Sequence, residues 1–205
     1  MKNNHIAFTG LAGVILFSIA SILGGFQFDD YSPVKQFISE TMAVGTPYGY
    51  MLRYFGYIPS GIFLTLFSFA IIKKLPSNKF IKTGFLVLAL FYGIATIVIG
   101  IFPCDEGCNK EWIDPSLSQI IHNFTGFLTY IFVPLSILTI GNGLRPYEKF
   151  TSLSKTAFLI GSLSFAFVLI LLSAPLSNYA GLFQRIIETL FIIWIVSCAM
   201  TIVRK

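Results

Sequence analysis

The stretch from Cys104 to Asn123 holds the densest group of reactive side chains in the chain. Cys104 and Cys108 lie four residues apart around a glycine, Asp105 follows the first of them, and His122 precedes Asn123. Thiolate, carboxylate and imidazole are ligand types that zinc accepts, although this spacing is not a standard zinc motif. We therefore predict a disulfide between the two cysteines, with a zinc site that adds Asp105 and His122 to both thiolates as the alternative.

A second polar group opens the last apolar stretch of the chain. Gln184 and Glu188 are four residues apart, and Arg185 and Glu188 are three apart, so all three side chains share one stripe of a helix. Two opposite charges at membrane depth are expected to pair, which satisfies both without any further function. The functional alternative is that Arg185 binds an anionic group while Glu188 positions His122 or binds a cation.

Glu40 and His122 each have a structural interpretation beside a functional one. Glu40 follows Ser39 in a short segment with helical spacing, where a solvated surface carboxylate is the more common case. His122 lies near the start of an apolar stretch, where it can simply bond a neighbouring backbone group or hydroxyl. An ionisable side chain inside a membrane span is nevertheless a functional-site hypothesis by default.

The composition around these residues indicates a membrane protein. Of the 205 residues, 55% are apolar and 11% are charged, and the mean hydropathy is +0.79. One soluble domain cannot bury so much apolar surface, which excludes an ordinary cytosolic enzyme. The continuous apolar runs exclude a β-barrel. We predict an all-α integral membrane protein, a six-helix bundle that forms one domain over residues 1–205. The predicted spans are Ile6–Phe26, Met51–Ile72, Thr83–Phe102, Gln119–Gly141, Thr156–Ala174 and Leu182–Val203.

The connection between the first two spans predicts one more helix. Ser32 is a good cap, Pro33 suits a first helical turn, and Gly45 and Pro47 end the segment. Apolar residues recur at helical spacing between these ends, at Val34, Phe37, Ile38 and Met42. We expect a short amphipathic helix from Pro33 to about Val44 on the outer membrane face.

Charge predicts the orientation of the bundle. Alternate connections place ten of the fourteen Lys and Arg residues, with one acid, on the side that holds both termini, and eight acids with four cations on the other. By the positive-inside rule, both termini are expected in the cytoplasm and the protein in the cell membrane. The cations lie in short loops beside the bilayer, so we expect membrane lipids as partners and no nucleic acid.

Three patches carry a resemblance to a known family. They are Tyr31–Glu40, Ile101–Cys108 with the later His122-Asn123, and Gly181–Arg185. In the order and spacing of these patches, nearly the whole chain resembles the small multi-spanning membrane proteins known as domain of unknown function 998, with a distant likeness to the Frag1, DRAM and Sfk1 group. The resemblance implies a six-helix fold and a membrane location, and it implies no catalytic roles.

All three patches fall on the predicted outer side, so their polar residues are expected to converge at one outward-facing pocket. The candidate ligand-binding residues are Glu40, Asp105, His122, Asn123, Gln184, Arg185 and Glu188. The first functional hypothesis is a binding or transport protein whose pocket binds a small molecule or a lipid headgroup without a cofactor, and whose acidic outer mouth attracts a cation or an amine.

Two other functions stay open. One is a hydrolase or transferase at the outer leaflet, with or without zinc, whose catalytic candidates are His122, Asp105 and Glu188. The chain has no recognised nucleophile motif to support it. The other is a structural or lipid-organising protein whose polar cluster only ties helix ends together.

Overall fold

Six long helices make up the fold, as the apolar runs predict. The computed structural model describes residues 2–204, and within that range there is no strand. The first, fourth and sixth spans are single helices: α1 (Asn3–Gly25), α6 (Leu117–Leu144) and α8 (Ala180–Val203). The second span, Gly49–Lys74, contains α2 (Gly49–Met51) and α3 (Ile58–Ile71), and the third, Lys79–Ile101, contains α4 (Lys79–Leu88) and α5 (Ala95–Ile101). The fifth span, Glu148–Ser173, contains α7 (Thr151–Ser173). All six are long and apolar enough to cross a bilayer, so this is a multi-pass membrane protein.

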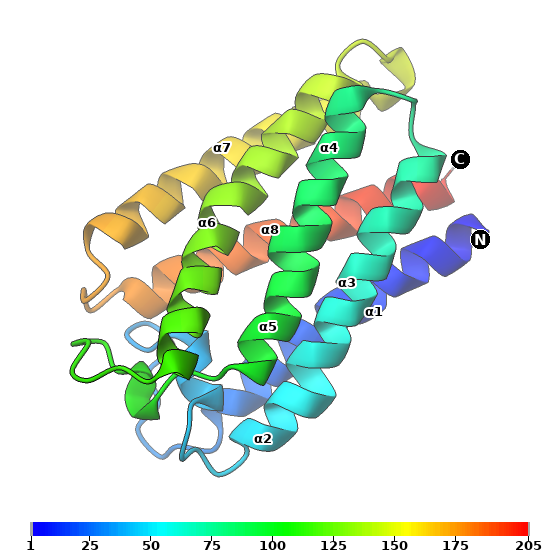
Figure 1. Ribbon diagram of the computed structural model, residues 1–205. Helices are drawn as coiled ribbons and strands as arrows, with labels where there is room; N and C mark the ends of the chain where they lie inside the picture. The colour runs from blue at the N-terminus through cyan, green and yellow to red at the C-terminus, as the bar shows by residue number, and fades with distance from the viewer. Residues whose placement is uncertain (1, 205) are drawn as a thin grey trace.

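The helices form a closed ring (Figure 1). Each span packs against the spans before and after it, and α8 completes the ring by packing on α1. The Asn3 amide donates to the Ile202 carbonyl oxygen at 2.8 Å, which ties the first span to the last. The ring encloses a core of large apolar side chains, among them Phe67, Phe85, Phe191 and Trp194.

Small residues let the helix backbones approach closely. A Cβ atom on Gly61 would lie 2.6 Å from the Gly93 carbonyl oxygen, so the second and third spans cross with their backbones in contact. Ser60 donates to the Gly13 carbonyl oxygen at 2.8 Å across the first and second spans. Such contacts hold membrane helices together where lipid supplies no hydrophobic drive to associate.

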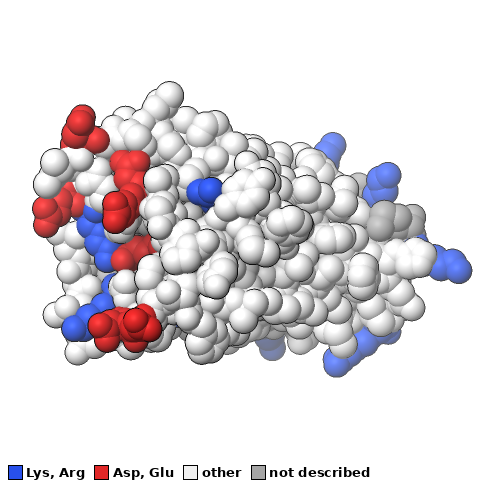
Figure 2. Space-filling view, turned by 90° about the horizontal axis from the view of Figure 1, so that it is seen from below, with Lys and Arg blue, Asp and Glu red and all other residues white. Residues whose placement is uncertain are grey.

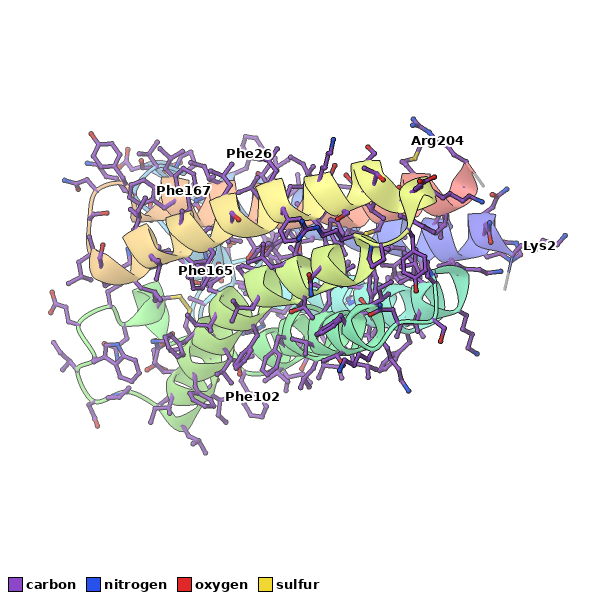
Figure 3. The ribbon with its side chains drawn as sticks, turned by 90° about the horizontal axis from the view of Figure 1, so that it is seen from above. Lys2, Phe26, Phe102, Phe165, Phe167 and Arg204 are labelled. Atoms are coloured by element: carbon purple, nitrogen blue, oxygen red, sulfur yellow. A yellow bond between two sulfur atoms is a disulfide. The ribbon has the colours of Figure 1, made fainter. Side chains whose placement is uncertain are left out.

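The two ends of the bundle differ in charge (Figure 2). The end formed by the loops after α1, α5 and α7, here called the acidic end, carries Asp29, Asp30, Glu40, Asp105, Glu106, Glu111 and Asp114. The opposite end, here called the basic end, carries nine of the described Lys and Arg residues and one acid, Glu148. Lys2 and Arg204 lie together at the basic end (Figure 3). The described ends of the chain are therefore on the same side of the bundle.

The segment between the first two spans differs from the predicted amphipathic helix. Only Ile38–Met42 is helical, as a 3-10 helix, and four of its five residues are buried. Phe37 has an extended backbone, with φ −66° and ψ 153°, so no helix can run from Pro33 through this point. The Phe37 N–H donates to the Glu40 carboxylate at 2.7 Å, which caps the short helix. The segment thus folds into the end of the bundle.

Candidate functional site

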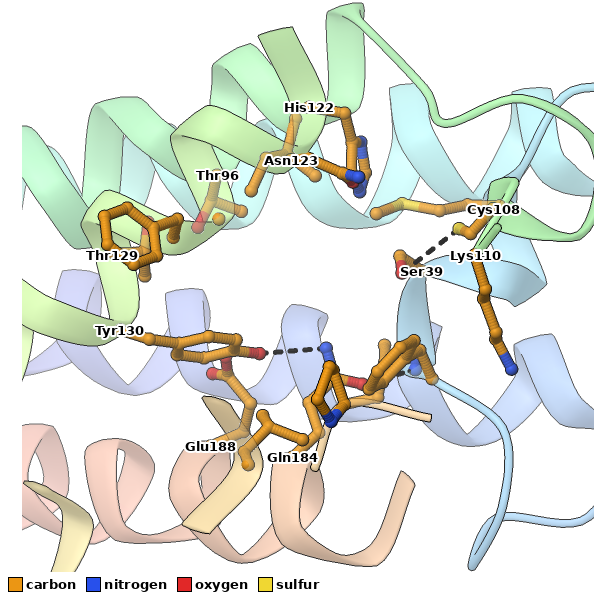
Figure 4. A pocket seen from close by; sticks show the side chains of 18 of the residues that line it. Ser39, Thr96, Cys108, Lys110, His122, Asn123, Thr129, Tyr130, Gln184 and Glu188 are labelled. Atoms are coloured by element: carbon orange, nitrogen blue, oxygen red, sulfur yellow. Dashed lines mark hydrogen bonds between the residues drawn. The ribbon is translucent and has the colours of Figure 1, made fainter. Parts of the chain in front are cut away.

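A cavity of about 420 Å³ lies inside the acidic end of the bundle (Figure 4). Most of its wall is apolar and aromatic. Its polar lining comes from α5, α6, α8 and the two long loops, at Ser39, Thr96, Lys110, His122, Asn123, Thr129, Tyr130, Gln184 and Glu188. A mainly apolar cavity with a few convergent polar groups is the usual form of a small-molecule site.

One side of the cavity is a hydrogen-bonded group on α6 and α8. The Gln184 amide donates to the Tyr130 hydroxyl at 2.8 Å, and the Gln184 carbonyl oxygen accepts the Ile38 N–H at 2.6 Å. This amide therefore links α8 to α6 and to the 3-10 helix at once. One turn further along α8, the Tyr130 and Tyr92 hydroxyls lie beside the Glu188 carboxyl.

Glu188 is buried without a full set of partners. Its side chain is 7% exposed, and its Oε2 atom has no hydrogen-bond partner among residues 2–204. The Tyr92 hydroxyl is also buried and unpartnered in that range. Buried polar atoms are nearly always satisfied in folded proteins, so these two neighbouring unpartnered atoms single out this part of the cavity wall as a candidate binding site.

His122 faces the cavity from the opposite side (Figure 4). It is 6% exposed, and its Nδ1 lies 2.9 Å from the Phe102 carbonyl oxygen. Since a carbonyl only accepts, Nδ1 carries the proton in this bond. The structural interpretation from sequence, a bond to a neighbouring backbone group, is therefore present, while the ring still lines the cavity.

Arg185 points away from the cavity. Its guanidinium donates to the carbonyl oxygens of Pro33 at 2.7 Å and Gln36 at 2.8 Å, and to the Tyr31 hydroxyl. Burial raises the pKa of Tyr31, although the neighbouring Arg185 opposes this. The expected ion pair of Arg185 with Glu188 does not form, because the carbonyl groups of the folded-in segment take up the guanidinium donors.

Glu40 is not the solvated carboxylate that the sequence favours. It is 8% exposed and pairs with Lys110 at 2.6 Å, the only ion pair between side chains of residues 2–204. The Lys110 ammonium also lies 5.3 Å from the centre of the Phe37 ring. This pair joins the two long loops over the cavity, and it neutralises Lys110, the one cation that lines the cavity among residues 2–204.

The predicted disulfide between Cys104 and Cys108 is present. Cys104 is fully buried and Cys108 is 6% exposed, and the pair packs against Ala43. One ligand atom from each cysteine and one from His122 lie within 4.8 Å of one another. With the two sulfur atoms bonded to each other, neither is a free thiolate for a metal.

Asp105 lies outside the cavity and organises the loop. Its carboxylate accepts the Ser116 N–H at 3.0 Å and the Ser116 hydroxyl at 2.5 Å. The hydrogen bonds from Ser116 hold the pKa of the Asp105 carboxyl below its usual range. Ser116 in turn caps α6 by accepting the Gln119 N–H at 3.1 Å, so Asp105 supports the start of the helix that carries His122.

The structure brings together four of the seven candidate residues. The four that line the cavity are His122, Asn123, Gln184 and Glu188. Glu40 touches it through Lys110, whereas Asp105 and Arg185 bind backbone groups elsewhere, so the expected convergence is partial. Sequence reasoning missed Tyr92 and Tyr130. Tyr130 lies eight residues after His122, which is helical spacing, and this signal could have found it.

A second hollow, of about 720 Å³, lies between α1 and α8. Arg185, Asp29 and Tyr31 line its end near the loops, and Ser18, Ile22 and Ile192 are among the residues that line its course along the helices. Glu188 lines both this groove and the cavity. The carboxyl-bearing side chain therefore forms part of the wall that separates the cavity from the α1–α8 surface.

Comparison with known proteins gives one match. A family model described as "Protein of unknown function (DUF998)" matches residues 11–201. No curated protein matches the chain, and no solved structure does. The match covers all six spans in whole or in large part, while the distant likeness to the Frag1, DRAM and Sfk1 group stays a prediction.

Proposed function

This chain belongs to the DUF998 family of proteins of unknown function, and on that premise we propose that it is a binding protein whose cavity takes up a small molecule or a lipid headgroup. One observation carries the proposal: the buried Glu188 Oε2, which has no hydrogen-bond partner among residues 2–204, belongs to a side chain that lines a cavity. Ionisable groups inside membrane spans are costly to bury and usually serve function.

The size and lining of the cavity support this function. Its volume of about 420 Å³ falls in the range of about 300–1,000 Å³ that small-molecule sites occupy. The Gln184, Tyr130 and Ile38 hydrogen bonds fix the polar groups before any ligand arrives. A site that is already ordered loses little conformational entropy when it binds.

We also place the cavity on the outer side of the cell membrane. The basic end carries nine described Lys and Arg residues and only one described acid, and such an excess of positive charge is typical of a cytoplasmic face. The disulfide lies at the acidic end, and disulfides persist outside the cytoplasm. Both observations support an orientation with the acidic end outside and the described ends of the chain inside.

The test compares wild-type protein with a variant whose cavity is filled. Gly126 lines the cavity, and a Cβ at this position would meet no atom within 4 Å, so Gly126→Leu starts a larger side chain from an open position on the cavity wall. Native mass spectrometry of protein extracted in mild detergent should show a bound molecule on the wild type that the variant lacks. Identical bound species on two equally folded proteins would contradict the proposal.

The second candidate is a zinc-dependent hydrolase or transferase. It is favoured by the cluster of Cys104, Cys108 and His122, and it requires the two thiols to be reduced. We expect thiol titration of the denatured protein to find one thiol, from Cys198, before reduction and all three afterwards. Three thiols without reductant, together with one zinc per chain that His122→Ala loses, would favour the enzyme instead.

A further inference from the structure

We propose that the ligand of this cavity carries a protonated amine, which pairs with the Glu188 carboxylate. The proposal rests on the binding function given above and names its ligand class. The geometry points to an amine because, among residues 2–204, Glu188 is the one acidic side chain that lines the cavity and no cation is paired with it.

Two cations are candidates to pair with Glu188, one near it in sequence and one that lines the same cavity, and both already bind other groups. Arg185, three residues before it on α8, donates to the carbonyl oxygens of Pro33, Gln36 and Gly181. Lys110, which also lines the cavity, pairs with Glu40 at 2.6 Å. A buried carboxylate needs a positive partner or several hydrogen bonds to offset the loss of water. The chain supplies no such cation, and the Tyr130 and Tyr92 hydroxyls that lie beside the carboxyl still leave its Oε2 atom without a partner within residues 2–204. We therefore assign the positive partner to the ligand.

The hydrogen-bonding groups around the cavity also favour a ligand that donates. The Gln184 amide is used by Tyr130, and the hydroxyls of Thr96 and Thr129 donate to carbonyl oxygens of their own helices. Two atoms remain without a partner in the described chain, the Glu188 Oε2 and the Tyr92 hydroxyl oxygen beside it, and both can accept a hydrogen bond. An ammonium group has only donors, which complements this inventory.

The remaining wall suits the carbon skeleton of an amine. Aromatic side chains line much of the cavity, at Phe17, Phe37, Tyr57, Tyr92, Trp112, Phe127 and Tyr130. Aromatic rings attract cations through their faces and bury apolar groups through their edges and faces alike. Acids outnumber Lys and Arg at the acidic end, which draws cations toward this part of the molecule. A primary amine with an apolar body fits both properties.

The competing account is that Glu188 is a neutral acid that needs no cation. Glu188→Gln separates the two accounts, because it keeps the shape of the side chain and removes its charge. If Glu188 is a neutral acid, Glu188→Gln should have little effect on what the cavity binds. If Glu188 forms an ion pair with the ligand, Glu188→Gln should remove that pair. Glu188→Asp keeps the charge on a shorter side chain and serves as the matched variant.

The experiment titrates the full chain in detergent micelles with matched pairs of probes. Phenethylamine is compared with phenethyl alcohol, and n-octylamine with n-octanol, because each pair shares a carbon skeleton and differs in charge. Binding is measured by calorimetry, and each protein is checked for its melting temperature. The proteins are the wild type, Glu188→Gln, Glu188→Asp and the cavity-filled Gly126→Leu.

We expect the wild type and Glu188→Asp to bind the amines at least about tenfold more tightly than the alcohols, which is the scale of a desolvated ion pair. Glu188→Gln should lose this preference, and Gly126→Leu should bind neither probe. Equal binding of amine and alcohol by the wild type, abolished in Gly126→Leu, would overturn the amine and leave the binding function standing. Binding that Gly126→Leu does not change would overturn both.

Discussion

Replacing Arg185 by alanine is expected to lower the free energy of unfolding by about 2 kcal/mol, because hydrogen bonds to a charged group contribute about 1.5–3 kcal/mol. The guanidinium holds the carbonyl oxygens of Pro33 and Gln36 and the Tyr31 hydroxyl, which together dock the first long loop onto α8. The measurement is thermal or denaturant unfolding of the purified protein in detergent.

The matched control is Arg204→Ala, at the exposed C-terminal end of the same helix. This substitution removes the same charge without removing hydrogen bonds to the first long loop, so its melting temperature should stay close to that of the wild type. Arg185→Lys should fall between the two, because a lysine keeps the charge but cannot span several acceptors with a planar fork. Equal stability of Arg185→Ala and Arg204→Ala would refute the docking role.

Gly61→Val is expected to destabilise the fold by about 3 kcal/mol, at the upper end of what an overpacked core usually costs. A Cβ at this position would lie 2.6 Å from the Gly93 carbonyl oxygen and 2.9 Å from the Ile97 backbone nitrogen. These are backbone atoms, so no side-chain rotation relieves the clash and the second and third spans must separate. Reduced recovery of folded protein and a lower melting temperature report the effect.

Gly126→Val provides the comparison, because it places the same side chain in a helix at a site where a Cβ meets no atom within 4 Å. This variant should fold and melt much like the wild type. If Gly61→Val and Gly126→Val are equally stable, the close backbone crossing at Gly61 does not hold the two spans together.

The spans and the disulfide could be predicted from sequence because their causes are local. A continuous apolar run of sufficient length specifies a membrane helix by itself. Cys104 and Cys108 are four residues apart, so almost any compact loop brings their sulfur atoms together. Asp105 is an intermediate case. It bonds Ser116 only eleven residues away, yet nothing in the spacing shows that the carboxylate supports a helix start instead of lining a pocket.

The partners of the charged residues depend on contacts that the sequence pattern does not encode. Arg185 binds a carbonyl group 152 residues before it in the chain. The expectation that Arg185 pairs with Glu188 rests on their spacing of three residues, which cannot reveal so distant an acceptor. Glu40 is buried because Lys110 arrives from another loop. The Tyr130 partner of Gln184 is 54 residues away on α6. The residue types show which segments carry polar groups, but the packing of the folded helices determines which of these groups face the cavity.

The most direct test of the binding function is an experimental structure of the protein crystallised from a lipidic mesophase after mild extraction. We expect density for a molecule that is not part of the chain in the cavity between His122 and Tyr130, within hydrogen-bonding distance of Glu188 Oε2. An empty or collapsed cavity, with Glu188 paired to a cation of its own chain, would contradict it.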